Sequence, residues 1–173
     1  MKGEILMNAD SPLKDKLILI VDDESDVLDI LEEMLDTCKI HRATDYDTAL
    51  KHLDNNTYDA VILDIMGVNG FELLKKAVSM GFPAIMLTAH ALTPEALKKS
   101  IKLGAVSFLP KEKMSEIRLF LEDIVADGGK PSWQKTFNRA GAIFNRRFGP
   151  AWREKDMFFK EFIEELNKET TSK

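Results

Sequence analysis

Short, mostly apolar runs alternate with segments whose apolar residues recur every three or four positions. The runs cover residues 16–21, 60–63, 83–88 and 105–109, and a short strand without such a run is expected at 39–43. The periodic segments cover residues 25–37, 45–55, 70–80, 94–103 and 114–126. Uninterrupted apolar runs are typical of strands buried on both faces, and the wider spacing is typical of amphipathic helices. The pattern predicts five strands alternating with five helices.

Residues that start and end helices separate these segments. Thr93 and Pro94 form a capping residue followed by proline, which is typical of a helix start, and Gly81 and Gly104 are typical of helix ends. Strict alternation with short connections favours a parallel sheet with right-handed crossovers. We therefore predict an α/β fold, a doubly wound (βα)5 sheet with helices on both faces.

The pattern changes after residue 127, where residues 128–131 are expected to form a linker. Beyond it, apolar and aromatic residues recur at helical spacing in two groups separated by Gly149 and Pro150. The groups are Trp133, Phe137, Ala140, Phe144 and Phe148, then Phe158, Phe159, Phe162, Ile163 and Leu166. We predict a loose arm at 1–13, a domain at 14–127 and a helical hairpin at 132–173, packed on the domain or on a second subunit.

Charge is distributed unevenly between these parts. The net charge of −5 arises from 15 basic and 23 acidic side chains in residues 1–130, against 9 and 6 in residues 131–173. Cys38 is the only cysteine, which excludes an internal disulfide and a cysteine-rich metal site. The longest apolar runs are far too short to span a bilayer. We expect a cytoplasmic protein without a transmembrane segment.

Polar residues stand where the predicted strands end. Asp22 and Asp23 follow the first strand, Asp64 the third, Thr88 the fourth and Lys111 the fifth. Ligands of open α/β sheets bind at the carboxyl ends of the strands, so these side chains should meet on one rim. No glycine-rich phosphate loop follows the first strand, which disfavours a dinucleotide or P-loop site. The carboxylates instead favour a hard divalent cation.

This set of residues resembles the receiver domain of two-component response regulators, the family of the bacterial chemotaxis regulator. The resemblance covers roughly residues 13–127. It rests on Asp-Asp after the first strand, Asp after the third, Thr-Ala after the fourth and Lys after the fifth, in that order. It implies a flavodoxin-like strand order of 2-1-3-4-5, and a sensor histidine kinase or phosphotransfer protein as phosphoryl donor.

The resemblance also implies a role for each site residue. By this resemblance Asp64 is the phosphoacceptor, and the divalent cation, Mg2+ or Mn2+, is held by Asp22, Asp23, Asp64 and the backbone carbonyl of Met66. The phosphoryl group is contacted by Thr88 and Lys111. The switch is formed by Thr88 and Phe108. The chemistry is consistent with these roles. A carboxylate attacks phosphorus when a cation neutralises the incoming charge, and a lysine and a hydroxyl complete the cradle.

Each residue also has a plainer explanation. Asp22 and Asp23 would serve as helix caps, Thr88 as an ordinary strand residue, Lys111 as a solvated loop charge and Phe108 as part of the core. All of these explanations would have to hold at once on the same rim. The joint occurrence therefore favours the functional interpretation.

Two features depart from the usual family pattern. The loop after Asp64 is two residues shorter, and Glu112 replaces the proline that usually follows the lysine. A cis peptide bond is much rarer before glutamate than before proline. Met66 and His90 take the variable positions beside the phosphoryl group, and we expect them to affect how readily water reaches an acyl phosphate.

Three functions are compatible with the sequence. The first is a phosphorylation-gated interaction protein, with no enzymatic activity beyond its own phosphorylation and dephosphorylation. The resemblance implies an output face that comprises the fourth helix, fifth strand and fifth helix. The charged residues there would either face a protein target or a second copy in a homodimer, or be ordinary surface charges; they are Lys98, Lys99, Lys102, Glu116, Arg118 and Asp123. The second is a transcription regulator whose basic C-terminal helix contacts DNA. The third is an aspartyl phosphatase, which would need an acid where Met66 stands.

The basic C-terminal helix is the main argument for a nucleic-acid or membrane contact. Residues 131–153, which include this helix, contain Lys135, Arg139, Arg146, Arg147 and Arg153 and no acid. Glutamates of the following helix, or the acidic domain, would neutralise it. We therefore expect protein interaction or dimerisation rather than nucleic-acid binding.

Overall fold

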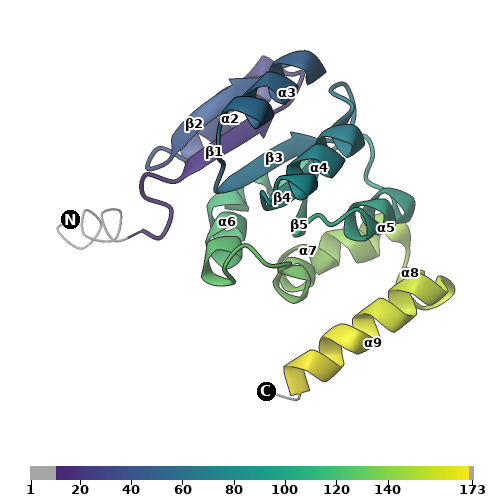
Figure 1. The fold of residues 1–173 in the computed structure, drawn as a ribbon. Helices are drawn as coiled ribbons and strands as arrows, with labels where there is room; N and C mark the ends of the chain where they lie inside the picture. The colour runs from purple at the N-terminus through teal and green to yellow at the C-terminus, as the bar shows by residue number, and fades with distance from the viewer. Residues whose placement is uncertain (1–10, 172–173) are drawn as a thin grey trace.

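The computed structural model describes residues 11–171 (Figure 1). The arm predicted at 1–13 lies outside the described residues over its first ten positions, and so do residues 172–173 of the predicted C-terminal hairpin. Leu13 is fully buried, and its carbonyl accepts a hydrogen bond from the Cys38 thiol. The last residue of that predicted arm is therefore packed into the core.

Five parallel strands form the sheet. They are β1 (Leu17–Val21), β2 (Lys39–Ala43), β3 (Ala60–Asp64), β4 (Ala84–Thr88) and β5 (Ser107–Pro110), in the spatial order β2-β1-β3-β4-β5. The predicted (βα)5 fold and its 2-1-3-4-5 order are confirmed. Because every strand runs in the same direction, the residues that follow β1, β3, β4 and β5 emerge at one edge.

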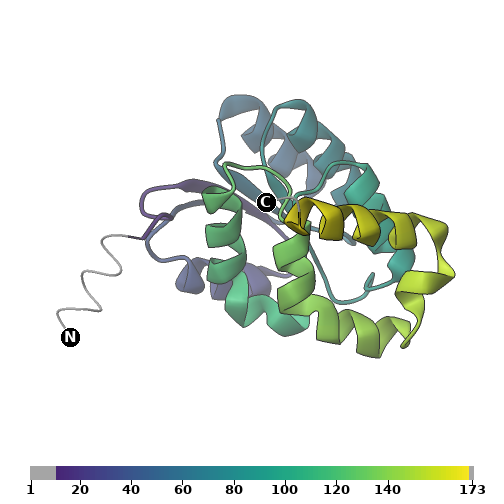
Figure 2. The same ribbon diagram turned by 90° about the horizontal axis from the view of Figure 1, so that it is seen from below.

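Helices cover both faces of the sheet. They are α2 (Ser25–Met34), α3 (Tyr46–Asn55), α4 (Gly70–Ser79), α5 (Pro94–Lys102), the 3-10 helix η1 (Lys111–Glu116) and α6 (Ile117–Ala126). Figure 2 shows α2 and α6 on one side and α3 and α4 on the other. As predicted, Thr93 caps α5, since its side chain accepts a hydrogen bond from the Ala96 amide.

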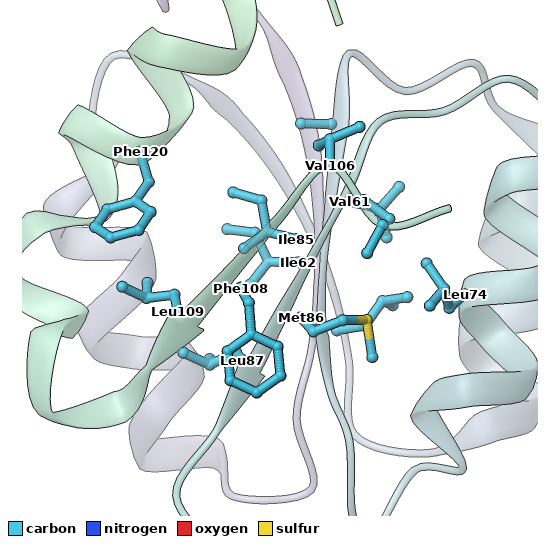
Figure 3. Close-up of a cluster of buried hydrophobic side chains, with 14 of the residues drawn as sticks. Val61, Ile62, Leu74, Ile85, Met86, Leu87, Val106, Phe108, Leu109 and Phe120 are labelled. Carbon is cyan, nitrogen blue, oxygen red and sulfur yellow. The ribbon is translucent and has the colours of Figure 1, made fainter. Parts of the chain in front are cut away.

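The core lies between these layers. Figure 3 shows Val61 and Met86 on the side of Leu74 in α4, while Leu109 lies on the side of Phe120 in α6. All residues of β3 and β4 are buried. Burial on both faces explains why these runs are apolar without alternation.

The predicted fifth helix differs at its start. Residues 111–116 form a 3-10 helix, and the α-helix begins at Ile117 instead of residue 114. Apolar residues three positions apart fit both helix types, so the spacing could not distinguish them. The 3-10 turn begins at Lys111 itself and so joins β5 directly to α6.

The C-terminal extension consists of α7 (Trp133–Phe148), the short α8 (Trp152–Lys155) and α9 (Met157–Thr171). The predicted hairpin thus contains an additional turn of helix at its bend. Figures 1 and 2 show α7 beside β5, between α5 and α6, with α9 on the outer side of α7. No helix within residues 11–171 has the length and apolar composition needed to cross a bilayer.

Candidate functional site

Three aspartates lie together at the carboxyl edge of the sheet. Asp22 follows β1 directly, Asp23 is next to it, and Asp64 ends β3. Their ligand oxygens all lie within 4.8 Å of one another. Asp22 and Asp64 are buried, whereas Asp23 is exposed. The predicted convergence of these residues is present in the structure.

Lys111 places a positive charge on this cluster. Its Nζ lies 2.9 Å from Asp22 Oδ2 and 3.7 Å from Asp64 Oδ1. Glu24 Oε1 is also 3.7 Å away. The Lys111 side chain is 13% exposed, so its ammonium group lies in a partly desolvated environment where water screens the charge poorly. Lys111 directly follows β5, which explains why it reaches the same edge.

The surroundings shift the pKa values of these groups. Burial, with a further contribution from the charge of Asp22, raises the pKa of Asp64 to about 7. Burial also raises the pKa of Asp22. Burial alone would lower the pKa of Lys111, but its close ion pair with Asp22 and the charge of Asp64 outweigh burial and raise it. Lys111 therefore remains protonated beside incompletely compensated negative charge.

Thr88 and Phe108 lie on adjacent strands. Thr88 ends β4 and is buried, and its Oγ1 accepts a hydrogen bond of 2.9 Å from the Ala91 amide. The hydroxyl thereby holds the start of the β4–α5 loop. Phe108 is fully buried in β5, and its ring lies 6.0 Å from that of Phe144 in α7.

The shortened loop after Asp64 depends on two glycines. Gly67 has φ +87°, and a Cβ there would lie 2.4 Å from Asp23 Oδ2. A Cβ on Gly70 would lie 2.0 Å from the Asp64 carbonyl oxygen. A side chain at Gly67 would displace the Asp23 carboxylate, and a side chain at Gly70 would require the loop backbone to move. Met66 is 54% exposed, and the role of its carbonyl as a ligand stays a prediction.

The donor set fits a divalent cation. Three carboxylates supply the hard oxygen ligands that Mg2+ prefers. Asp22 Oδ2 is buried and, within residues 11–171, has no aligned hydrogen-bond donor, although the Lys111 ammonium forms an ion pair with it. A cation held by Asp22, Asp23 and Asp64 would offset their charge and polarise a phosphoryl oxygen.

Two acidic residues near the site have contacts that the sequence analysis did not identify. Glu24, directly after the paired aspartates, contributes to the field around Lys111. Glu112 forms ion pairs with Arg146 at 2.6 Å and with Arg147 at 3.4 Å. The adjacency of Glu24 to the aspartates is a usable sequence signal, whereas no local pattern links Glu112 to residues in α7. The backbone from residue 11 to 171 contains no cis peptide bond.

The charged side chains expected to face a partner are engaged within the chain. Lys98 pairs with Asp156, and Arg118 pairs with Asp36. Glu116 pairs with Lys113, and Asp123 pairs with Arg139. The ammonium group of Lys99 lies over the ring of Phe71, and that of Lys102 lies over the ring of Phe158. The basic residues of α7 are likewise paired with the domain, since Lys135 contacts Asp127. Their partners come from the domain rather than from α9.

Sequence comparisons identify the family. The family model described as response regulator receiver domain matches residues 18–122. The chain is 37% identical over 100 residues to the two-component response regulator ARR18 of Arabidopsis thaliana, covering 54% of this chain and 16% of ARR18. It is 32% identical over 131 residues to the response regulator MprA of Mycobacterium sp. (strain KMS), covering 69% of this chain and 56% of MprA. The chain thus spans only part of these relatives.

Solved structures show the same fold. The receiver domain protein (CheY-like) of Methanospirillum hungatei JF-1 aligns with a TM-score of 0.56 at 25% identity, covering 66% of this chain and 99% of that chain. The receiver domain of NtrX from Brucella abortus aligns with a TM-score of 0.55 at 27% identity, covering 66% and 98%. The family match ends before α7. The chain therefore belongs to the response regulator receiver domain family, with a helical extension beyond the matched residues.

Proposed function

We propose that Asp64 accepts a phosphoryl group from a sensor histidine kinase or phosphotransfer protein of a two-component system. The observation that carries the proposal is the joint position of three aspartates and Lys111 at one sheet edge. The family membership of the chain supports it.

The reaction is a substitution at phosphorus. An ionised Asp64 oxygen forms the new P–O bond as the bond between phosphorus and the donor breaks, and the donor leaves with the electron pair of that bond. The Lys111 ammonium, 3.7 Å from Asp64 Oδ1, stabilises the charge on the transferred group. A divalent cation, Mg2+ or Mn2+, would supply the second positive charge, held by Asp22, Asp23 and Asp64 with the Met66 carbonyl.

The consequence is a change in protein interactions, with no turnover of a separate substrate. A phosphoryl group adds nearly two negative charges and strong acceptors to the edge. We expect the Thr88 hydroxyl to be drawn toward it, away from the Ala91 amide, and Phe108 to repack. The face formed by α5, β5 and α6 would then respond.

A DNA-binding role has less support. The arginines of α7 that would contact phosphates already pair with acidic residues of the domain, among them Arg139 with Asp123 and Arg146 with Glu112. Each pair would have to be broken to release a cation for nucleic acid. Retention on DNA that falls steeply with salt would favour that function.

Intact mass spectrometry after incubation with acetyl phosphate tests the proposal. We expect a gain of one phosphoryl group that requires Mg2+ and is absent from Asp64→Asn. Asp47→Asn, which removes an exposed carboxylate of α3, is the matched control and should be modified like the wild type. A modified Asp64→Asn would contradict the assignment. Solution molecular weight, measured on the same samples, tests whether the modified form dimerises.

A further inference from the structure

We propose that the chain's own extension, α7 to α9, is the partner of the face formed by α5, β5 and α6, and that phosphorylation of Asp64 loosens this docking. The inference rests on the proposed function. In the unmodified state, the extension would keep other partners from this face. In the modified state, the face and the aromatic side of α7 would become available together.

The edge strand β5 is attached to α7 at its first two residues, and the residue before β5 is bonded to the residue before α7. The Ser132 amide donates a hydrogen bond of 2.8 Å to the Val106 carbonyl, just before β5. The hydroxyl groups of Ser107 and Thr136 are hydrogen-bonded to each other. The next residue, Phe108, packs against Phe144. Three consecutive residues, Val106 to Phe108, thus contact α7 and the residue that precedes it.

The same segment continues into the acidic site. Lys111 pairs with Asp22, and the adjacent Glu112 pairs with Arg146, with atoms 2.6 Å apart, and with Arg147. Residues 106–112 are therefore one short stretch of backbone that contacts both the edge carrying Asp64 and α7. No intervening loop can absorb a displacement at Lys111, because η1 begins at that residue.

The flanking helices of the face are also covered. On α5, Lys98 pairs with Asp156 at 2.6 Å, and Lys98 and Lys102 lie over the ring of Phe158. On α6, Asp123 accepts two hydrogen bonds from Arg139, of 2.6 and 3.1 Å. The extension thus makes specific contacts with all three elements of the face.

The electrostatics set the direction of the change. A phosphoryl group on Asp64 attracts the Lys111 ammonium away from Asp22 and moves the chain at Glu112 with it. The ion pairs of Glu112 with Arg146 and Arg147 are formed while Lys111 pairs with Asp22. A movement of Glu112 that follows Lys111 would therefore lengthen them. Exposed ion pairs stabilise only weakly, so a shift in the docking equilibrium is energetically accessible.

Hydrogen exchange measured by mass spectrometry tests the proposal on the whole chain. The protein is compared with MgCl2 alone and with MgCl2 plus acetyl phosphate, and intact mass gives the modified fraction of each sample. We expect faster exchange in peptides of α7 and α9 after modification, and unchanged exchange in β1 and β2. Trp133 and Trp152, the only tryptophans, are buried in the extension, so easier quenching of their fluorescence by acrylamide is a second readout.

Glu112→Gln tests the connection itself. The variant should be phosphorylated like the wild type. Before phosphorylation its α7 peptides should exchange hydrogen faster than those of the wild type, and phosphorylation should increase their exchange rate by less than it does in the wild type. Glu32→Gln is the matched control, because Glu32 is 42% exposed and pairs with Arg42 at 3.1 Å, against 41% exposure for Glu112. It should behave like the wild type.

Each outcome has one meaning. Modified protein with unchanged or slower exchange in α7 would overturn the inference and leave the proposed function standing. Absence of modification would overturn the proposed function and the inference with it. A Glu112→Gln protein that responds as fully as the wild type would overturn the connection through residues 106–112.

Discussion

Two regions of the molecule hold their side chains together by opposite means. At the carboxyl edge of the sheet, Asp22 and Asp64 are buried beside each other, with the Lys111 ammonium close to both. In the extension, the fully buried Phe144 and Phe159 belong to a cluster of aromatic rings. Like charges repel at the first region, whereas the second gains from apolar burial and ring packing.

The carboxylate edge provides the chemistry at a cost in stability, whereas the aromatic region stabilises the fold. The raised pKa of Asp64 shows that the folded edge favours the protonated carboxyl over the ionised form. The edge therefore lowers the stability of the cation-free protein while it poises a carboxylate for chemistry. The aromatic region offsets this cost, and it also connects to the edge through β5. Neutralising a buried carboxylate at the edge should consequently raise the free energy of unfolding, whereas truncating a buried ring in the extension should lower it.

The largest expected effect is that of Phe144→Ala. Phe144 is fully buried between the rings of Phe108 and Trp152. Its truncation should lower the free energy of unfolding by about 3–5 kcal/mol, because it removes apolar burial and leaves a cavity. Urea denaturation measures this loss. Phe158→Ala, at a half-buried position, is the comparison, and an equal or larger loss there would contradict the ranking.

Asp64→Asn should have the opposite sign. The pKa of Asp64 is about 7 in the folded protein against 3.8 for the free group. The native state thus binds the extra proton between these values, and wild-type stability falls as pH rises from about 4 to about 7. The variant should lack that part of the decline and be more stable at pH 8, by roughly 2–4 kcal/mol. Denaturation at pH 5 and pH 8 with a chelator checks this, and a destabilised variant at pH 8 would refute it.

Gly67→Ala should affect stability and metal binding together. Its φ of +87° disfavours a side chain, and the Cβ would collide with the Asp23 carboxylate. We expect a loss of about 1–2 kcal/mol in the free energy of unfolding and weaker Mg2+ binding by calorimetry. Gly81→Ala is the control, because Gly81 has φ +79° with nothing within 4 Å of a Cβ. Equal Mg2+ affinities in the two variants would show that the Asp23 contact is unimportant.

The smallest expected effect is that of Arg139→Lys. Arg139 holds Asp123 through two hydrogen bonds, and lysine cannot reproduce this paired geometry. Both side chains are partly solvent-exposed, so the loss should be about 1 kcal/mol or less. Urea denaturation at low and high salt measures it. A loss comparable to that of Phe144→Ala would mean that polar contacts, rather than rings, hold the extension.

The edge could be predicted from the sequence because few arrangements of parallel strands are possible. Asp64 and Lys111 are far apart in the chain, but both follow buried strands, so the sheet brings them to one edge. The extension illustrates the limit of this reasoning. Helical spacing predicts that Phe144 is on an apolar face, but it does not specify Phe108 as the residue it meets. Glu112 and Arg146, 34 residues apart, likewise pair through tertiary packing that no local pattern encodes.

The most direct test of the central claim is to locate the phosphoryl group by peptide mass mapping after reaction with acetyl phosphate and Mg2+. Borohydride reduction, which converts an aspartyl phosphate to a stable product, fixes the position before digestion. We predict that Asp64 alone is modified. Modification of Asp22 or Asp23 instead, or an unmodified chain, would contradict the claim that this edge of the sheet presents Asp64 as the acceptor.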